Sequence, residues 1–172
     1  MKKTLTSLVI TSISMFALTL GEVPKDISLS GDNGGKVDGT AWQSNMIKDK
    51  VYVFFYVDPD KKDDNEAFID ALHEKNYDKE QYGSIAIINL KATWLPNFAI
   101  EKKLEAKQKE FQNTIYAKDK TKHLVQEWAL ADDASNVLIF DKDGKLIYQY
   151  DGAIEKDEMQ KAFALIEENL NK

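Results

Sequence analysis

Four aspartates crowd one short segment of the chain, and their side chains are the ones whose type and spacing could do chemistry. They are Asp58, Asp60, Asp63 and Asp64. Carboxylate oxygens are the ligands that hard cations such as Ca²⁺ prefer, and closely spaced carboxylates can also act as general acids and bases. However, Lys61 and Lys62 interrupt the alternation of acids that a calcium loop requires, and the glycine of such a loop is missing.

The aspartate segment therefore has two interpretations. We expect a solvated loop whose last acids cap the following helix, with no catalytic residue, no metal ion and no other cofactor. The two histidines support this expectation, because His73 and His123 have no partner at metal-ligand spacing and are expected at the surface. The alternative is a metal- or carboxylate-dependent enzyme that uses the loop from Asp58 to Asp64.

The residues on either side of the aspartates predict a strand–loop–helix junction. Val51–Val57 is an almost continuous apolar and β-prone run, as in a strand that is covered on both faces. After the loop, Asp63 and Glu66 have capping-box spacing, and Phe68 and Leu72 then form an apolar helical stripe. Such junctions are common places for chemistry in α/β folds.

The remaining pattern predicts a single α/β domain with a mixed sheet. Further strands are expected at Ser84–Leu90, Thr114–Ala117, Val137–Phe140 and Lys145–Tyr150, and helices at Phe98–Gln112, Leu124–Trp128 and around Met159–Leu170. The Asp-Gly pair before Lys145 supplies the positive φ that a tight hairpin turn requires. By contrast, Ile27–Leu29 and the turn Gly31–Gly35 are expected to form only a short hairpin or loop.

Composition excludes several classes of function. The chain has no cysteine, which removes thiol redox chemistry, and all 23 basic residues are lysines, which removes any mechanism that needs a guanidinium group. The net charge of −6 argues against nucleic acid and anionic lipid as partners.

The first residues predict export. Lys2 and Lys3 precede an uncharged apolar stretch, which is typical of a secretory signal peptide and is short for a membrane span. We expect cleavage near residues 17–21, which removes two lysines and leaves a periplasmic domain, 22–172, with a net charge of −8. No stable membrane insertion is expected after cleavage, and an uncleaved anchor is the alternative.

Trp94 is the remaining candidate for a functional side chain. It lies in the loop Thr93–Asn97, after a predicted core strand, and so at the same end of the sheet as Asp58. We expect it to pack beneath the following helix, and the alternative is an exposed binding anchor.

The chain resembles the YtfJ family of exported bacterial proteins, which have a thioredoxin-like fold. The resemblance covers nearly the whole mature chain and rests on Val51–Val57, Asp141–Gly144 and the terminal helix, together with Gly21–Pro24, Trp42, Ser44, Lys50, Tyr82, Asn89 and the stretch from Ala134 to Ala153. It implies a thioredoxin-like three-layer sandwich of the peroxiredoxin and TlpA type, with a central mixed sheet, in the periplasm and with no established activity.

The resemblance also implies where a redox-active relative would carry its chemistry. The two cysteines would fall within Asp58–Asp64, and a cis-proline would stand before Val137, where this chain has Ala134, Ser135 and Asn136. A retained scaffold without its thiols suggests a non-catalytic protein that binds a periplasmic protein or peptide. The candidate binding surface comprises Asp58, Asp60, Asp63, Asp64, Trp94 and Ser135.

Overall fold

A six-stranded mixed sheet forms the centre of the computed structural model, which describes residues 17–172. Most of the expected signal peptide lies outside the described residues. In spatial order the strands are β2 (Gly34–Lys36), β6 (Thr114–Asp119), β5 (Tyr82–Asn89), β4 (Val51–Val57), β7 (Ser135–Phe140) and β8 (Leu146–Asp151). The helices are α1 (Glu66–Lys75), α2 (Asn97–Glu110), α3 (His123–Trp128) and α4 (Lys156–Leu170).

The sheet confirms the expected central strand and sets where the loops meet. All seven residues of β4 are buried. The strand pairs in parallel with β5 and antiparallel with β7, and β5 continues in parallel with β6. The carboxyl ends of β4, β5 and β6 therefore lie together at one end of the sheet, along the direction of the strands. We call this end the carboxyl edge.

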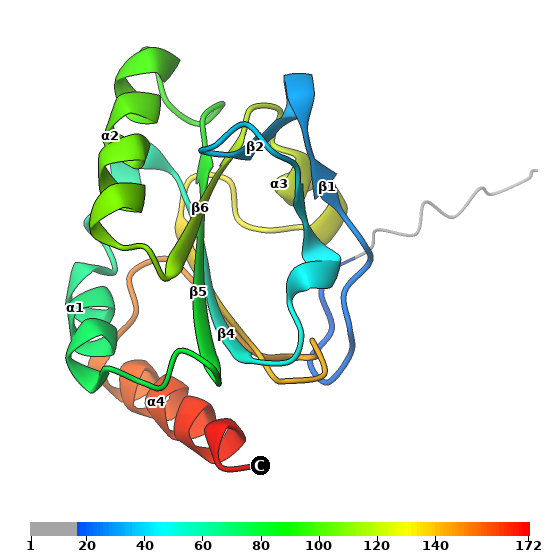
Figure 1. The fold of residues 1–172 in the computed structure, drawn as a ribbon, viewed down its shortest axis with the longest axis vertical. Coiled ribbons are helices and arrows are strands. Elements are labelled where there is room, and N and C mark those ends of the chain that lie inside the picture. Colours follow the sequence, from blue (N-terminus) through cyan, green and yellow to red (C-terminus); the bar gives the residue numbers. More distant parts are fainter. Residues whose placement is uncertain (1–16) are drawn as a thin grey trace, which may run out of the picture.

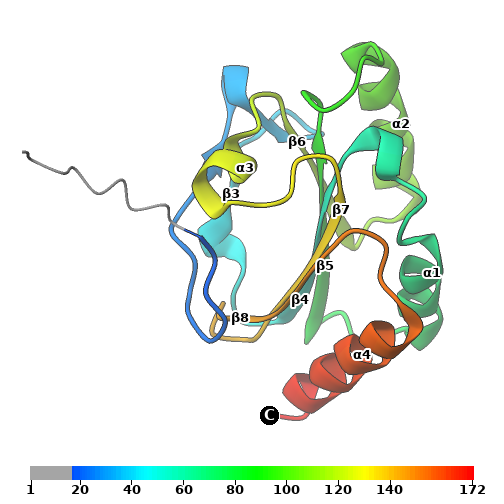
Figure 2. The same cartoon turned by 180° about the vertical axis from the view of Figure 1, so that it is seen from behind.

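Three layers result from covering both faces of the sheet (Figures 1 and 2). Helices α1, α2 and α4 cover one face, and α3 covers the other together with a two-stranded sheet of β1 (Ser28–Leu29) and β3 (Trp42–Gln43). Residues of β4 alternate between the two cores, since Val53 packs toward α1 and α4 whereas Phe54 packs beside Trp42 and Trp128. The expected three-layer arrangement is confirmed.

An aromatic cluster fills the core under α3. The ring centroid of Phe54 lies 5.8 Å from that of Trp42, 5.8 Å from that of Trp128 and 6.1 Å from that of Phe140. Trp128 also donates its indole N–H to the carbonyl of Lys25, at 2.9 Å. Tilted and edge-on ring pairs add about 0.5–1.5 kcal/mol each beyond their buried area, so this cluster fixes the N-terminal segment against the sheet.

The N-terminal segment is more ordered than the sequence predicted. Residues of the expected loop form β2, which pairs antiparallel with β6 at the sheet edge. A Cβ atom on Gly34 would lie 1.9 Å from the carbonyl oxygen of Lys118, so the close approach of the two backbones needs glycine. The glycine-rich turn can be recognised in the sequence. The strand could not be, because β2 pairs with β6, which lies far along the chain.

The hairpin and the terminal helix follow the sequence prediction. Gly144 has a φ of 80°, and the Asp141 carboxylate accepts hydrogen bonds from the N–H groups of Asp143 and Lys145. Helix α4 buries Ala162 and Ile166 against the sheet. Within residues 17–172, no helix is long and apolar enough to cross a membrane.

Candidate functional site

Asp58 directly follows β4 and is a buried residue of the turn that leaves the sheet. Only 3% of it is exposed, and its N–H donates to the carbonyl of Ala134 at 3.0 Å. Its carboxylate accepts from the N–H of Asp60 at 2.8 Å and so caps the short 3₁₀ helix Pro59–Lys61. Burial raises the pKa of the Asp58 carboxyl, the bond from the Asp60 N–H partly opposes this rise, and the charges of Asp60 and Asp133 add to it.

Asn65 is the residue that joins this junction to the rest of the fold. It is 1% exposed, and its side-chain amide donates to the carbonyl and hydroxyl oxygens of Ser135, at 3.0 and 2.9 Å, and to the carbonyl of Gly152 at 3.1 Å. Its amide oxygen accepts from the N–H of Ile154 at 2.8 Å. One side chain thereby connects the start of α1, the start of β7 and the segment before α4.

The expected capping by Asp63 is wrong. Helix α1 begins at Glu66 with Asn65 in the capping position, and the side chain of Asp63 is exposed and paired with Lys62. The only bond between Asp63 and Glu66 runs from the Glu66 N–H to the Asp63 carbonyl. The capping-box spacing is present, but the 3₁₀ turn after Asp58 leaves the Asp63 side chain in solvent.

A second asparagine closes the junction beside Ser135. Asn136 is fully buried, and its side-chain amide donates to the carbonyls of Tyr56 and Ala131, at 3.1 and 2.9 Å. Its oxygen accepts from the N–H of Ala131 at 3.0 Å. Where a cis-proline was expected in redox-active relatives, the chain thus carries two polar residues whose side chains are bonded internally.

A buried carboxylate that the sequence analysis missed lies on the other face of the sheet. Asp119 ends β6 with no exposed surface and accepts from the hydroxyl of Tyr56 at 3.1 Å. It also accepts from the N–H groups of Thr121 and Leu124, each at 3.0 Å, which holds the start of α3. Burial and the Asp119 charge raise the pKa of Tyr56, so its hydroxyl stays protonated as a donor. The sequence signal that could have indicated this role is an aspartate at the end of a strand, shortly before a helix begins.

Trp94 is fully exposed, so the expectation that it packs beneath the helix is wrong. Leu95 and Phe98 are 50% and 74% exposed, and we call these three residues the apolar edge patch. The physical reason is that α2 turns Ile100 and Leu104 toward the sheet, which leaves the side chains at its start facing solvent.

The aspartate loop and the loop that carries Trp94 are joined. The hydroxyl of Thr93 donates to the Asp60 carboxylate at 3.1 Å and accepts from the N–H of Leu95 at 3.2 Å. The candidate residues therefore separate into two groups. Asp58 and Ser135 are buried and structural, whereas Asp60, Asp63, Asp64 and Trp94 are exposed at the carboxyl edge.

The exposed carboxylates do not converge on a common point. Across residues 17–172, no group of three or more acidic or histidine side chains is placed to hold a metal ion. A cavity of about 370 Å³ lies elsewhere, and none of the candidate residues lines it. The carboxyl edge therefore offers an outward-facing surface for contact.

The arrangement defines a thioredoxin-like α/β domain that carries no thiol. Its backbone is similar to a putative thiol:disulfide interchange protein DsbE from Chlorobium tepidum, with a TM-score of 0.64 and 14% identity over 90% of this chain and 99% of that chain. It is also similar to a peroxiredoxin-like protein from Aquifex aeolicus, with a TM-score of 0.59 and 19% identity over 87% and 89% of the two chains. Since cysteine is absent, the shared fold comes without thiol redox chemistry.

The chain belongs to the family described as "Bacterial protein of unknown function (YtfJ_HI0045)", which matches residues 23–169. It is 24% identical over 133 residues to "Uncharacterized protein YtfJ" of Escherichia coli (strain K12), covering 75% of this chain and 72% of that protein. The resemblance drawn from the sequence is confirmed.

Replacing Asn65 tests which residue holds the start of α1. In Asn65→Ala the buried N–H of Ile154 and carbonyl of Gly152 lose their partner, so we expect the free energy of unfolding to fall by about 2–3 kcal/mol. Asp63→Ala, the matched control, removes an exposed side chain and should change it by less than about 0.5 kcal/mol. Urea unfolding measures both, and a larger loss in Asp63→Ala than in Asn65→Ala would contradict this assignment.

The raised pKa of Asp58 predicts a specific dependence of stability on pH. The carboxyl has its ordinary pKa of 3.8 when unfolded and a higher pKa when folded, so folding favours the protonated form. The stability that Asp58 contributes is therefore greatest below 3.8 and declines as the pH rises through the folded-state pKa. Asp58→Asn keeps the acceptor oxygen but cannot ionise. The stability of Asp58→Asn relative to the unmodified protein should rise between pH 3.8 and the folded-state pKa of Asp58, and level off above that pKa.

Urea unfolding at a series of pH values measures this difference, with the exposed Asp64→Asn variant as the matched control. A stability difference for Asp58→Asn that is flat across the range, or that falls with pH, would overturn the prediction.

Proposed function

We propose that the protein is a non-catalytic accessory protein of the bacterial cell envelope that binds a partner segment through the apolar edge patch. The observation that carries the proposal is the full exposure of Trp94 beside the half-exposed Leu95 and the largely exposed Phe98. Large apolar side chains grouped on a surface mark interaction sites, and tryptophan is enriched among the residues that dominate binding energy.

The patch is presented by rigid elements. Buried Ile100 and Leu104 fix α2 on the sheet, and the Thr93–Asp60 hydrogen bond ties the preceding loop to the end of β4. A surface that is held in place loses little conformational entropy on binding, which favours affinity.

The charge around the patch indicates the chemistry of the partner. The loop joined to the patch exposes three aspartates and two lysines, which are Asp60, Asp63, Asp64, Lys61 and Lys62. Its exposed side chains are therefore net negative, as is the whole chain with a net charge of −6. Complementary charge steers association and sets specificity. The partner segment is accordingly an apolar stretch of protein flanked by lysine or arginine.

Selection of a random-peptide display library against the protein tests the patch. We expect enriched peptides that combine aromatic or aliphatic residues with basic ones, and binding that weakens as salt rises. Trp94→Ala should lower the affinity for a selected peptide at least about thirtyfold, while the free energy of unfolding changes by less than about 0.5 kcal/mol. Val23→Ala, an exposed apolar change outside the patch, is the control. Peptides that bind Trp94→Ala and the unmodified protein equally would overturn the proposal.

The envelope location rests on the sequence of residues 1–21 and has its own test. The N–H of Gly21 donates to the carbonyl of Leu146 at 2.7 Å, and the carbonyl of Glu22 accepts from the N–H of Leu146 at 2.9 Å. Leu18 also packs against the core, so the described chain contacts the domain from residue 18 onward. We expect intact mass spectrometry of the periplasmic fraction to find a chain that begins between residues 18 and 22. Recovery of the full 172-residue chain from the cytosol would contradict export.

A further inference from the structure

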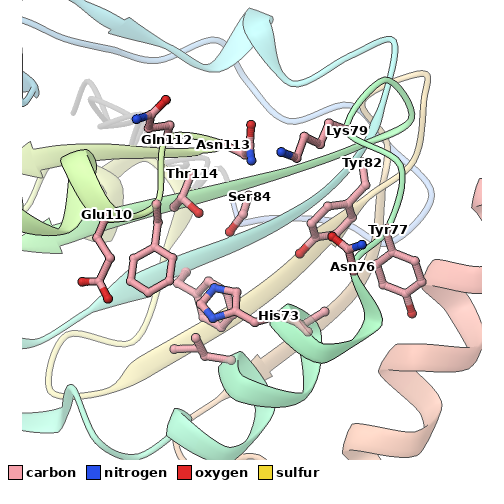
Figure 3. A pocket seen from close by; sticks show the side chains of 14 residues that line it. His73, Asn76, Tyr77, Lys79, Tyr82, Ser84, Glu110, Gln112, Asn113 and Thr114 are labelled. Carbon is pink, nitrogen blue, oxygen red and sulfur yellow. The ribbon is translucent and has the colours of Figure 1, made fainter.

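A groove opens at the edge of the sheet opposite the carboxyl edge, between the C-terminal ends of α1 and α2 (Figure 3). Its volume is about 370 Å³, within the range of roughly 300–1,000 Å³ that small-molecule sites occupy. Tyr82, Ser84 and Thr114 line it from the starts of β5 and β6. The groove is therefore separate from the apolar edge patch and does not depend on the function proposed for that patch.

Aromatic rings line the groove from α1, from the segments that follow α1 and α2, and from β5. His73 of α1 stacks on Phe111, which follows α2, with ring centroids 4.7 Å apart and an angle of 18° between the planes. Tyr77 and Tyr82 form a second pair, with centroids 5.3 Å apart. Such rings offer flat apolar faces, against which the C–H groups of a saturated ring can pack.

Side-chain amides at the groove are free of internal partners. Among the described residues, no side-chain hydrogen bond holds the amides of Asn76, Gln112 and Asn113, which are all exposed and labelled in Figure 3. The buried Asn65 and Asn136, in contrast, are bonded on both amide atoms. An amide donates and accepts at once, so three of them suit a ligand whose groups do the same.

The charges at the groove disfavour anionic ligands. Lys79 and Glu110 contribute one charge of each sign to the groove, and Figure 3 places them at opposite ends of it. Both α1 and α2 end here, and helix C-termini carry partial negative charge, which disfavours anions such as phosphates. Burial also raises the pKa of Tyr77 and Tyr82, so both phenols stay neutral.

We propose that this groove is a binding site for a neutral N-acetylated sugar of one or two rings. The hydroxyl and acetamido groups of such a ligand both donate and accept hydrogen bonds, as the amides of Asn76, Gln112 and Asn113 require. Its acetyl methyl group and C–H face match the rings of His73 and Tyr82. A wholly apolar ligand would use none of these amides, and a nucleotide would place its phosphates near two helix C-termini.

Titration of the ¹⁵N-labelled protein with N,N′-diacetylchitobiose tests the proposal. We expect saturable NMR shifts at His73, Asn76 and residues 111–114, with a Kd of about 1 mM or below. Gln112→Ala combined with Asn113→Ala should weaken binding at least about tenfold, because two hydrogen-bonding groups are lost. Gln160→Ala, an exposed change on α4, is the matched control and should leave the Kd unchanged.

Two comparison ligands make the test specific. Cellobiose, which lacks the acetamido groups, should bind more weakly than N,N′-diacetylchitobiose, and the dipeptide Ala-Ala should not shift the groove signals. Equal affinity for Ala-Ala and the acetylated sugar, no saturation up to about 10 mM, or an unchanged Kd in the double variant would each overturn the proposal.

Discussion

The burial of β4 on both faces is the constraint on which the rest of the structure depends. Every side chain from Val51 to Val57 is enclosed, so two separate cores must form on opposite sides of one strand. Because water does not reach this strand, its backbone groups have to be paired by β5 on one side and β7 on the other. The backbone N–H of Asp58, the residue after β4, must also be paired, and it donates to the carbonyl of Ala134.

Polar side chains meet that requirement at the junction. A redox-active protein would need thiolates there, held in a partly exposed site that keeps them reactive. Here Asn65 and Asn136 instead bond the backbone of neighbouring segments, and Asp58 and Ser135 are buried within the same set of hydrogen bonds. The junction is thus closed by internal hydrogen bonds, because a buried polar group left unpaired would destabilise the fold.

The surfaces available for contact accordingly lie at the two ends of the sheet. Trp94 and its neighbours present apolar area at the carboxyl edge, beside the loop that exposes Asp60. The opposite end presents rings and free amides in a groove between two helix C-termini. The two surfaces differ in shape and chemistry, and they lie at opposite ends of the sheet.

The sequence by itself determined the strands β4 to β8, the helices, the hairpin turn and the absence of thiol chemistry. Those features are local, since an apolar run such as Val51–Val57 or a missing residue type can be recognised without a distant partner. The tertiary structure decided which residue holds the start of α1, because Asn65 finds its partners 70 and 89 residues away. It also decided the exposure of Trp94 and the groove beside His73. Both depend on which face of α2 meets the sheet, and that choice follows from packing between segments that the sequence lists far apart.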